Sequence, residues 1–250
     1  MTVATIFGLQ RSGTNFSEQL VKRNLVGVNT VVQWNKPNGI WKHAYNIDNG
    51  GVKSGAKPNS AGNRRDPQKY ELIGKTIKAW YIHKNPYSWI ESICTKHVDI
   101  KKHYPWVMQN QCKEEYREEF LELKQLNVAA LAELYRDHTE FWHRVCNEKN
   151  IFHLSYEDLI RSPESTQLGL KAYAQFYGLE LRSNIIQIPE KVGQSEKFDE
   201  RQREKYKKVK LKILTWKQVM KINSILNHEH TLWQGYEIIG TQESFNNRKV

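Results

Sequence analysis

The chain has 250 residues, the length of one domain or of one domain with a modest insertion, so it needs no disulfide or metal to complete a core. Apolar residues make up 39% of it and charged residues 26%, a balance that excludes an intrinsically disordered chain. The 38 Lys and Arg against 27 Asp and Glu give a net charge of +11, which predicts an anionic partner such as a nucleic acid, a membrane surface or a phosphorylated metabolite.

The N-terminal part of the chain predicts a strand, a glycine-bearing loop and a helix. Residues 2–7 are a short apolar run that ends at a glycine, which is typical of a buried strand. After the loop, apolar residues recur at helical spacing at Phe16, Leu20, Val21 and Leu25. Two strand-like segments follow at 28–34 and 39–44. Residues 49–70 are rich in Gly, Ser, Asn and Pro and predict a long, flexible surface loop.

The middle of the chain alternates strands with helices. Residues 77–83 predict a second clear strand, and Pro86 ends it before a helix. The charged segment 114–148 is helix-prone, with buried positions expected at Phe120, Leu123, Leu131, Leu134, Phe141 and Trp142. A short strand is expected at 151–154.

The last part of the chain predicts helices, and the whole pattern predicts the fold class. Helical patterns occur at 156–161 and 164–178, and a basic helix is expected near 197–211. A further helix begins near Thr215, with one face formed by Trp216, Val219, Met220 and Leu226. Strands that alternate with helices predict a single α/β domain over residues 1–250, with a central, mainly parallel sheet flanked by helices and a P-loop-like strand-loop-helix at its start.

The cysteines and the apolar runs predict the compartment. Cys94, Cys112 and Cys146 form no CxxC pair, which argues against a disulfide framework or a structural zinc site and fits a reducing compartment. No apolar stretch approaches the ~18 residues that a membrane span requires, and the first residues lack the basic segment of a signal peptide. We therefore expect a cytoplasmic protein.

The most informative segment is Gly8-Leu9-Gln10-Arg11-Ser12-Gly13-Thr14-Asn15-Phe16, between the first strand and the first helix. Its glycines have the spacing of the phosphate-binding loop GxxxxGK[ST]. Glycine permits the positive φ angles that turn N–H groups inward, and the helix N-terminus adds donors for an anion. The segment therefore predicts a phosphate site, and a tight turn in which the glycines serve only geometry is the alternative. Thr14 replaces the lysine of the motif, which argues against an ATP or GTP hydrolase.

Several segments, in the same order along the chain, resemble the sulfotransferases that use 3′-phosphoadenosine 5′-phosphosulfate (PAPS). Residues 10–16 look like the 5′-phosphosulfate loop of that family, a basic residue followed by Ser-Gly-Thr. The segment His83-Lys84-Asn85-Pro86 is similar to the end of a strand in Arg-(Asp/Asn)-Pro, with Ser92 eight positions after the cation. Tyr156-Glu157-Asp158-Leu159 resembles the Tyr-Glu-Asp-Leu of the family, and residues 232–236 resemble its Leu-Gly-Tyr ending more weakly.

The resemblance implies a P-loop-like fold that binds PAPS across the carboxyl ends of parallel strands, releases 3′-phosphoadenosine 5′-phosphate (PAP) and requires no metal. The 5′-phosphosulfate would be held by Arg11, Ser12, Gly13, Thr14 and Asn15. The 3′-phosphate would be bound by Lys84 and Ser92, and the adenine by Phe16 and Tyr156. Lys84 replaces the usual arginine and offers a point charge instead of a bidentate contact. Lys197 and Arg201 are weaker candidates for the 3′-phosphate, because the segment beginning at Gly193 has only one of the two glycines of the family pattern.

Two residues are the candidates for catalysis. Arg11 is always charged and suits stabilisation of the transferring group and the departing phosphate, but it cannot donate a proton. His43 is the best of nine histidines for the proton acceptor, because it follows a strand-like segment between the two cofactor signatures and its ordinary pKa lies near neutrality. A surface or hydrogen-bonded histidine is the alternative. His83 is expected to point away from the site, because side chains alternate along its strand.

The predicted function is therefore in-line transfer of a sulfuryl group from PAPS to a hydroxyl or amine of a small molecule or saccharide. A nucleotide or small-molecule kinase shares the loop but needs magnesium and the lysine that Thr14 displaces. A nucleic-acid-binding module would use residues 191–212, with nine Lys and Arg against four Asp and Glu, but no known nucleic-acid-binding motif accompanies them. The basic segment 53–69 would suit an anionic acceptor. Five tryptophans of the first half could stack on an acceptor, although core packing explains tryptophans more often: Trp34, Trp41, Trp80, Trp89 and Trp106.

Overall fold

A four-stranded sheet forms the centre of the computed structural model, which describes residues 2–30, 42–43, 45, 67–95, 100–118, 121–192, 196–197, 200, 203–204 and 209–249. The strands lie in the order β2-β1-β3-β6, and each pairs with its neighbour in parallel. Their bounds are Thr2–Phe7 (β1), Val28–Thr30 (β2), Ile77–His83 (β3) and Phe152–Ser155 (β6). The predicted α/β class with a mainly parallel sheet is confirmed.

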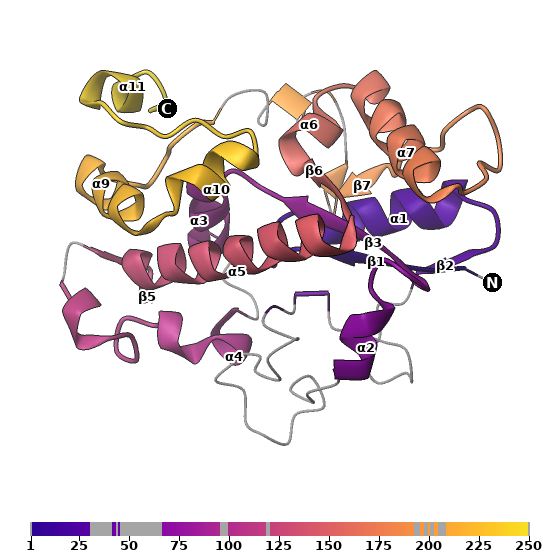
Figure 1. Ribbon diagram of the computed structural model, residues 1–250. Helices are drawn as coiled ribbons and strands as arrows, with labels where there is room; N and C mark the ends of the chain where they lie inside the picture. The colour runs from indigo at the N-terminus through magenta and orange to yellow at the C-terminus, as the bar shows by residue number, and fades with distance from the viewer. Residues whose placement is uncertain are drawn as a thin grey trace.

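Helices cover both faces of this sheet. Figure 1 shows α1, α6 and α7 together on one side of it; they span Thr14–Asn24, Tyr156–Ile160 and Pro163–Tyr177. Their apolar residues pack against Ala4, Ile6 and Trp80 of the sheet. The other core cluster contains residues of α3 (Pro86–Thr95), α5 (Val128–Lys149) and α9 (Trp216–Ile225). There, Trp142 of α5 stacks on Tyr81 with ring centroids 5.4 Å apart and contacts Phe7 at 4.5 Å.

Short elements connect these layers and complete the chain. Other helices in the described part of the chain are α2 (Pro67–Leu72), α4 (Ile100–His103), α10 (His228–Trp233) and α11 (Gln242–Asn246), with short 3₁₀ turns η2 (Pro105–Val107) and η3 (Glu114–Tyr116). Two antiparallel pairs are formed by β4 (Glu122–Leu123) with β5 (Leu126–Asn127) and by β7 (Lys191–Val192) with β8 (Glu196–Lys197).

The long helix predicted over 114–148 begins later than expected. The chain first makes the β4–β5 turn, in which Lys124 and Gln125 have positive φ angles of 53° and 70°, a conformation that no helix can contain. The helix α5 then begins at Val128, where the side chain of Asn127 accepts a hydrogen bond from the N–H of Ala130. Local capping therefore overrides the helix propensity of the preceding charged residues. Phe120 lies outside the described residues.

Other boundaries also differ from the sequence predictions. Lys42 and His43 lie in a turn, not in the strand expected at 39–44, because they bond to the loop after β1. The segment predicted as a loop at 49–70 ends in α2, which Pro67 begins at a position where its missing N–H is not needed. Residues 31–34, 39–41 and 49–66 lie outside the described part of the chain.

Two predictions for the last part of the chain need correction. Of the basic helix expected at 197–211, Lys197 lies in β8, residues 200, 203 and 204 are helical, and residues 209–210 are not. The helix α9 begins as predicted, with a capping box between Thr215 and Gln218, but Met220 is 44% exposed. The buried face of α9 consists of Gln218, Val219, Ile222 and Asn223, so polar residues replace Met220 on it.

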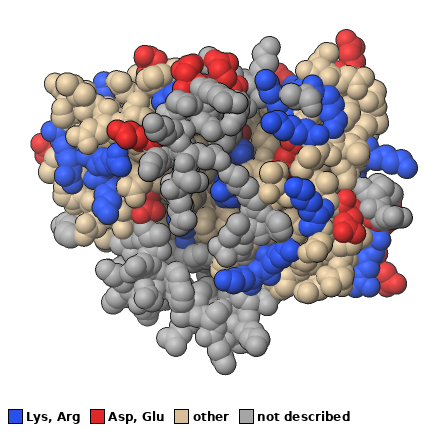
Figure 2. All heavy atoms as spheres, turned by 180° about the vertical axis from the view of Figure 1, so that it is seen from behind, with Lys and Arg blue, Asp and Glu red and all other residues tan. Residues whose placement is uncertain are grey.

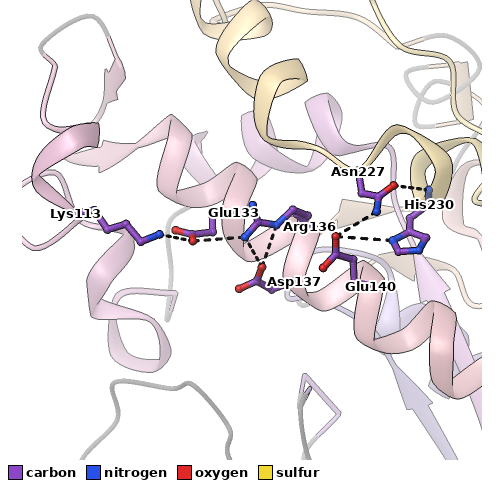
Figure 3. Close-up of polar contacts among 7 residues, drawn as sticks. All are labelled: Lys113, Glu133, Arg136, Asp137, Glu140, Asn227 and His230. Carbon is purple, nitrogen blue, oxygen red and sulfur yellow. Dashed lines mark hydrogen bonds and ion pairs between the residues drawn. The ribbon is translucent and has the colours of Figure 1, made fainter.

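Polar contacts run along one face of α5 and join it to two other parts of the chain (Figure 3). Lys113 Nζ lies 2.6 Å from Glu133 Oε1, one end of this row. At the other end, Glu140 accepts a hydrogen bond from Asn227 at 3.3 Å and lies 4.0 Å from His230 Nδ1. Exposed ion pairs contribute only about 0–1 kcal/mol each. The row therefore orients the α9–α10 segment on α5 more than it stabilises the fold.

A stronger attachment of the C-terminal part is made by Glu91 of α3. Its carboxylate is 8% exposed and accepts backbone hydrogen bonds from Lys212, Ile213 and Leu214 at 2.8–3.0 Å. These N–H groups precede α9 and have no strand partner in the described sheets. A buried carboxylate that accepts several N–H groups is worth more than an exposed pair, because removing it leaves buried donors without an acceptor.

We expect Glu91→Gln to lower the free energy of unfolding by about 2–3 kcal/mol, because the neutral amide accepts at one atom only and directs its own N–H groups at backbone donors. Urea denaturation measures this loss. Glu71→Gln is the matched control: Glu71 forms exposed ion pairs with Lys75 and Lys149, so its change should stay within about 0.5 kcal/mol. Equal stability of the two variants would show that Glu91 does not hold the segment.

Candidate active site

The candidate site lies at the carboxyl edge of the sheet, where β1 and β3 end side by side. β1 pairs with β2 on one side and with β3 on the other, so the chain changes direction across the sheet between these two pairings. In open α/β sheets such a switch point leaves a crevice beyond the strand ends, and ligands bind there. The loop at 8–13 follows β1, and Lys84 follows β3 directly.

Both glycines of the loop are required by close contacts. A Cβ atom on Gly8 would lie 2.2 Å from the carbonyl oxygen of Ile82 in β3. Gly13 has a φ of +92°, and a Cβ there would lie 2.1 Å from the ring of Tyr156. Neither approach is possible for any other residue. The loop is thus pressed against β3 on one side and against the start of α6 on the other.

Hydrogen bonds within and behind the loop fix its shape. The N–H and Oγ–H of Ser12 both donate to the carbonyl of Leu9, at 3.1 and 2.5 Å. The indole N–H of Trp89 in α3 donates to the carbonyl of Gln10 at 2.7 Å. Ser12 is buried, so in this structure it shapes the loop and presents neither donor outward. Arg11 is the exposed residue at the turn, in the left-handed region with a φ of 69°.

The structure brings together three of the residues predicted to bind phosphate. Arg11 Nε lies 3.4 Å from Ser92 Oγ, so the loop and α3 meet here. Lys84 is only 4% exposed, and burial lowers the pKa of its ammonium to about 8. The nearby charge of Arg11 lowers this pKa too, whereas Glu157 and Glu91 raise it. Arg11 and Lys84 thus place two positive charges at this edge of the sheet, a combination that favours an anionic ligand.

The start of α1 adds further donors to this place. Gly13 is the N-terminal cap of α1 and provides no side-chain acceptor for the first amides of the helix. Thr14 is buried, and Asn15 is exposed and accepts a hydrogen bond from Lys42 Nζ. Lys42 also lies 3.7 Å from Glu18, and burial lowers the pKa of this lysine. An uncapped helix start beside basic side chains is suited to an anion.

His43 lies directly beneath the loop. It is 9% exposed, and its Nδ1 lies 2.6 Å from the carbonyl oxygen of Gly8, while the N–H of Gly8 donates to the carbonyl of Lys42 at 2.9 Å. Because a carbonyl only accepts, Nδ1 carries the proton, and Nε2 of the neutral ring keeps its lone pair. Burial lowers the pKa of His43 to about 3, with smaller contributions from Lys42 and His103. The ring is therefore neutral at physiological pH.

The two residues predicted to contact adenine also meet, but in the core. Phe16 and Tyr156 are 1% and 2% exposed, and their rings make an edge-to-face contact with centroids 6.3 Å apart. Tyr156 lies against Gly13, so it supports the loop from below. Their contact with a base stays a prediction, as do the roles of Lys197 and Arg201, of which Arg201 lies outside the described residues.

The site contains two residues, Trp89 and Glu157, to which the sequence gives no role there. Trp89, for which the sequence predicts a place in the core or against an acceptor, is buried and donates its indole N–H to the loop. Trp80 is also buried in the core. Glu157 belongs to the motif at residues 156–159, in which the resemblance implies a role for Tyr156 alone. His83, which alternation predicts to point away from the site, is buried, and its Nδ1 lies 3.1 Å from the hydroxyl of Tyr236.

The face of the molecule seen from behind carries more basic than acidic side chains among its described residues. Figure 2, the view from behind, shows several groups of Lys and Arg and fewer Asp and Glu on this face. Within the described parts of the chain, no helix is long and apolar enough to cross a membrane.

Comparison with known families agrees with this geometry. The family model described as the sulfotransferase domain matches residues 2–230, which includes the loop after β1, the end of β3 and the start of α6. A search of curated proteins gives no match to the chain. Because the family model spans nearly all of the 250 residues, the chain belongs to the sulfotransferase family.

Proposed function

We propose that this sulfotransferase takes its sulfuryl group from PAPS and transfers it in line to a hydroxyl or amine of a small molecule or saccharide, leaving PAP. The observation that carries the proposal is the pair of cations at the strand ends. Arg11 reaches Ser92 of α3, and its charge acts on the buried Lys84, so the site offers two positive charges to one ligand. A nucleotide that carries phosphate groups on both the 3′ and the 5′ oxygen of its ribose can bind both of these positive charges.

The residues present fit such a nucleotide. The 5′-phosphosulfate suits the loop after β1 and the uncapped start of α1. The loop can approach β3 and α6 this closely only with glycine at positions 8 and 13. Arg11 contacts that end, with Thr14 and Asn15 at the helix start, while Ser12 shapes the loop. Lys84 and Ser92 suit the 3′-phosphate. Phe16 and Tyr156 are proposed for the adenine end.

PAPS supplies the activated sulfuryl group, and the chain supplies charge and a base. Arg11 is a fixed cation that stabilises negative charge on the departing phosphate side as transfer proceeds. His43 Nε2 accepts the proton of the acceptor hydroxyl or amine, because Nδ1 is already bonded to the carbonyl of Gly8. The backbone hydrogen bond from the Gly8 N–H to the carbonyl of Lys42, with the side-chain bond of His43 to the Gly8 carbonyl, keeps the base and the loop in a fixed relation.

The test of this function is binding of PAP against adenosine 5′-monophosphate (AMP), which differ only in the 3′-phosphate. We expect the wild-type protein to bind PAP more tightly, and Lys84→Ala to reduce that preference about ten- to a hundredfold, because a charged hydrogen bond is worth about 1.5–3 kcal/mol. Titration calorimetry at pH 7 measures both affinities.

Lys78→Ala is the matched control, since Lys78 lies in the same strand with its ammonium exposed and bonded to the carbonyl of Lys75. It should leave the preference unchanged. Equal affinity of the wild-type protein for PAP and AMP would contradict the proposed donor.

A further inference from the structure

The carboxylate of Glu157 connects three parts of the chain at the end of β3. Oε1 accepts a hydrogen bond from the N–H of Asn85 at 3.1 Å, and Oε2 accepts one from the hydroxyl of Tyr236 at 2.9 Å. The His83 Nδ1 lies 3.1 Å from the same hydroxyl. The Tyr236 hydroxyl thus accepts a hydrogen bond from His83 and donates one to Glu157. Tyr236 and the N–H of Asn85 together fix the two oxygens of the carboxylate. This arrangement uses both acceptor oxygens of an ionised carboxylate.

Lys84 lies between His83 and Asn85, and ionisable groups from several elements surround its ammonium. The charged groups that act on it are Arg11 in the loop after β1, Glu91 on α3 and Glu157 on α6. Tyr135 on α5 donates a hydrogen bond to the backbone carbonyl of Lys84, and Tyr236 after α10 donates one to Glu157. Glu157 provides the largest opposing charge among them: it raises the pKa of Lys84 against burial, while Arg11 lowers it. In return, Lys84 lowers the pKa of Glu157, which burial raises.

We propose that Glu157 is a positioning residue for the 3′-phosphate: its hydrogen bond from the N–H of Asn85 fixes the backbone beside Lys84 at the end of β3, its negative charge favours the charged form of Lys84, and Tyr236 holds Glu157 itself. This inference rests on the proposed function, in which Lys84 binds that phosphate. It gives the C-terminal segment a part in nucleotide recognition, because Tyr236 comes from beyond α10. It also explains how a buried lysine can replace a residue that is always charged: a fixed partner compensates for desolvation.

The pH dependence of binding separates this role from a structural one. Lys84 must be protonated to bind the 3′-phosphate, so the preference for PAP over AMP should decline as pH rises through its pKa of about 8. Glu157→Gln keeps the size and removes the charge, so this decline should move to lower pH by about one unit. At pH 8 the preference for PAP should then be about fivefold smaller than in the wild-type protein. Affinity for AMP should be unchanged.

Two further variants complete the experiment, which measures PAP and AMP affinities by calorimetry between pH 7 and 9.5. Asp158→Asn makes the same charge change at the next position, where the carboxylate pairs with Ser155 and Arg161, and should leave the decline in place. Tyr236→Phe keeps the charge of Glu157 and removes one hydrogen bond, so the preference should fall slightly with the decline still near pH 8.

Three results would overturn the inference. A decline at the wild-type pH in folded Glu157→Gln overturns the inference, as does an equal loss of PAP and AMP affinity in that variant. A shift in Asp158→Asn as large as in Glu157→Gln also overturns it, because the effect would then be one of net charge. A wild-type protein without any preference for PAP instead removes the 3′-phosphate site, and with it the proposed donor.

Discussion

His43→Ala is expected to lower kcat by about two to four orders of magnitude while leaving the affinity for PAP nearly unchanged. Burial holds the imidazole neutral, with its Nδ1 proton on the carbonyl of Gly8, and in the proposed function Nε2 is the atom that accepts the proton. Steady-state kinetics with an acceptor that the wild-type protein sulfates, together with PAP titration, measure the two effects separately.

The wild-type pH profile provides a second check on His43. A protonated imidazole cannot accept a proton, so activity should be lost as pH falls through the pKa of His43. Because that pKa is lowered to about 3, His43 should cause no loss of kcat between pH 8 and pH 5.5. Near-normal kcat in a folded His43→Ala protein would exclude the histidine as the base and leave Lys42, which lies next to it, for study.

Stability toward acid is expected to fall steeply below pH 6.5, because three histidines are buried in the neutral state. Burial lowers the pKa of His43 to about 3 and the pKa values of His83 and His138 well below the ordinary value. The unfolded chain therefore binds more protons than the folded one in this range, so stability is present above pH 6.5 and is lost below it. Each histidine contributes up to about 1.4 kcal/mol per pH unit, about 4 kcal/mol together.

Urea denaturation between pH 7.5 and 5 measures this slope. Glu18 and Glu157 have pKa values raised by burial and oppose part of it at the acid end, so a comparison of variants is the sharper test. His138→Phe should reduce the slope by one proton, about 1.4 kcal/mol per pH unit. At pH 7.5 it should cost little, because neither ring nitrogen of His138 has a hydrogen-bond partner among the described residues. An unchanged slope would contradict the buried neutral state of His138.

The parts of the site that sequence could predict are those fixed by local chemistry. The spacing of Gly8 and Gly13, the apolar run before them and the helical pattern after them predicted the strand, loop and helix correctly. The positions of Lys84 and Ser92 followed from the strand that Pro86 ends and the helix that begins there. In each case the residues that are close in the sequence determine the backbone conformation.

The rest depends on contacts between distant residues. Glu91 binds the backbone of residues more than 120 positions away, and nothing near Glu91 in the chain indicates this. Glu157 acquires its function only when the ends of β3 and of the C-terminal segment reach it. The pKa of His43 was expected near neutrality because burial, which lowers it, is a property of the folded chain. The start of α5 was missed because the β4–β5 turn precedes it.

The contacts of α3 require that Ser92 stand eight positions after Lys84, because the number of residues sets the direction in which each side chain of the helix points. Trp89 directs its N–H to the loop, Glu91 turns to the segment before α9, and Ser92 meets Arg11, all within about one turn of the helix. Each residue advances a helix by about 100° and 1.5 Å. One inserted residue after Pro86 would rotate all three side chains away from their partners at once, whereas the same insertion before β3 would change only a connection. The end of β3 and the start of α3 therefore determine this interval together. Insertions and deletions should be tolerated better in the connections outside α3 than within the helix.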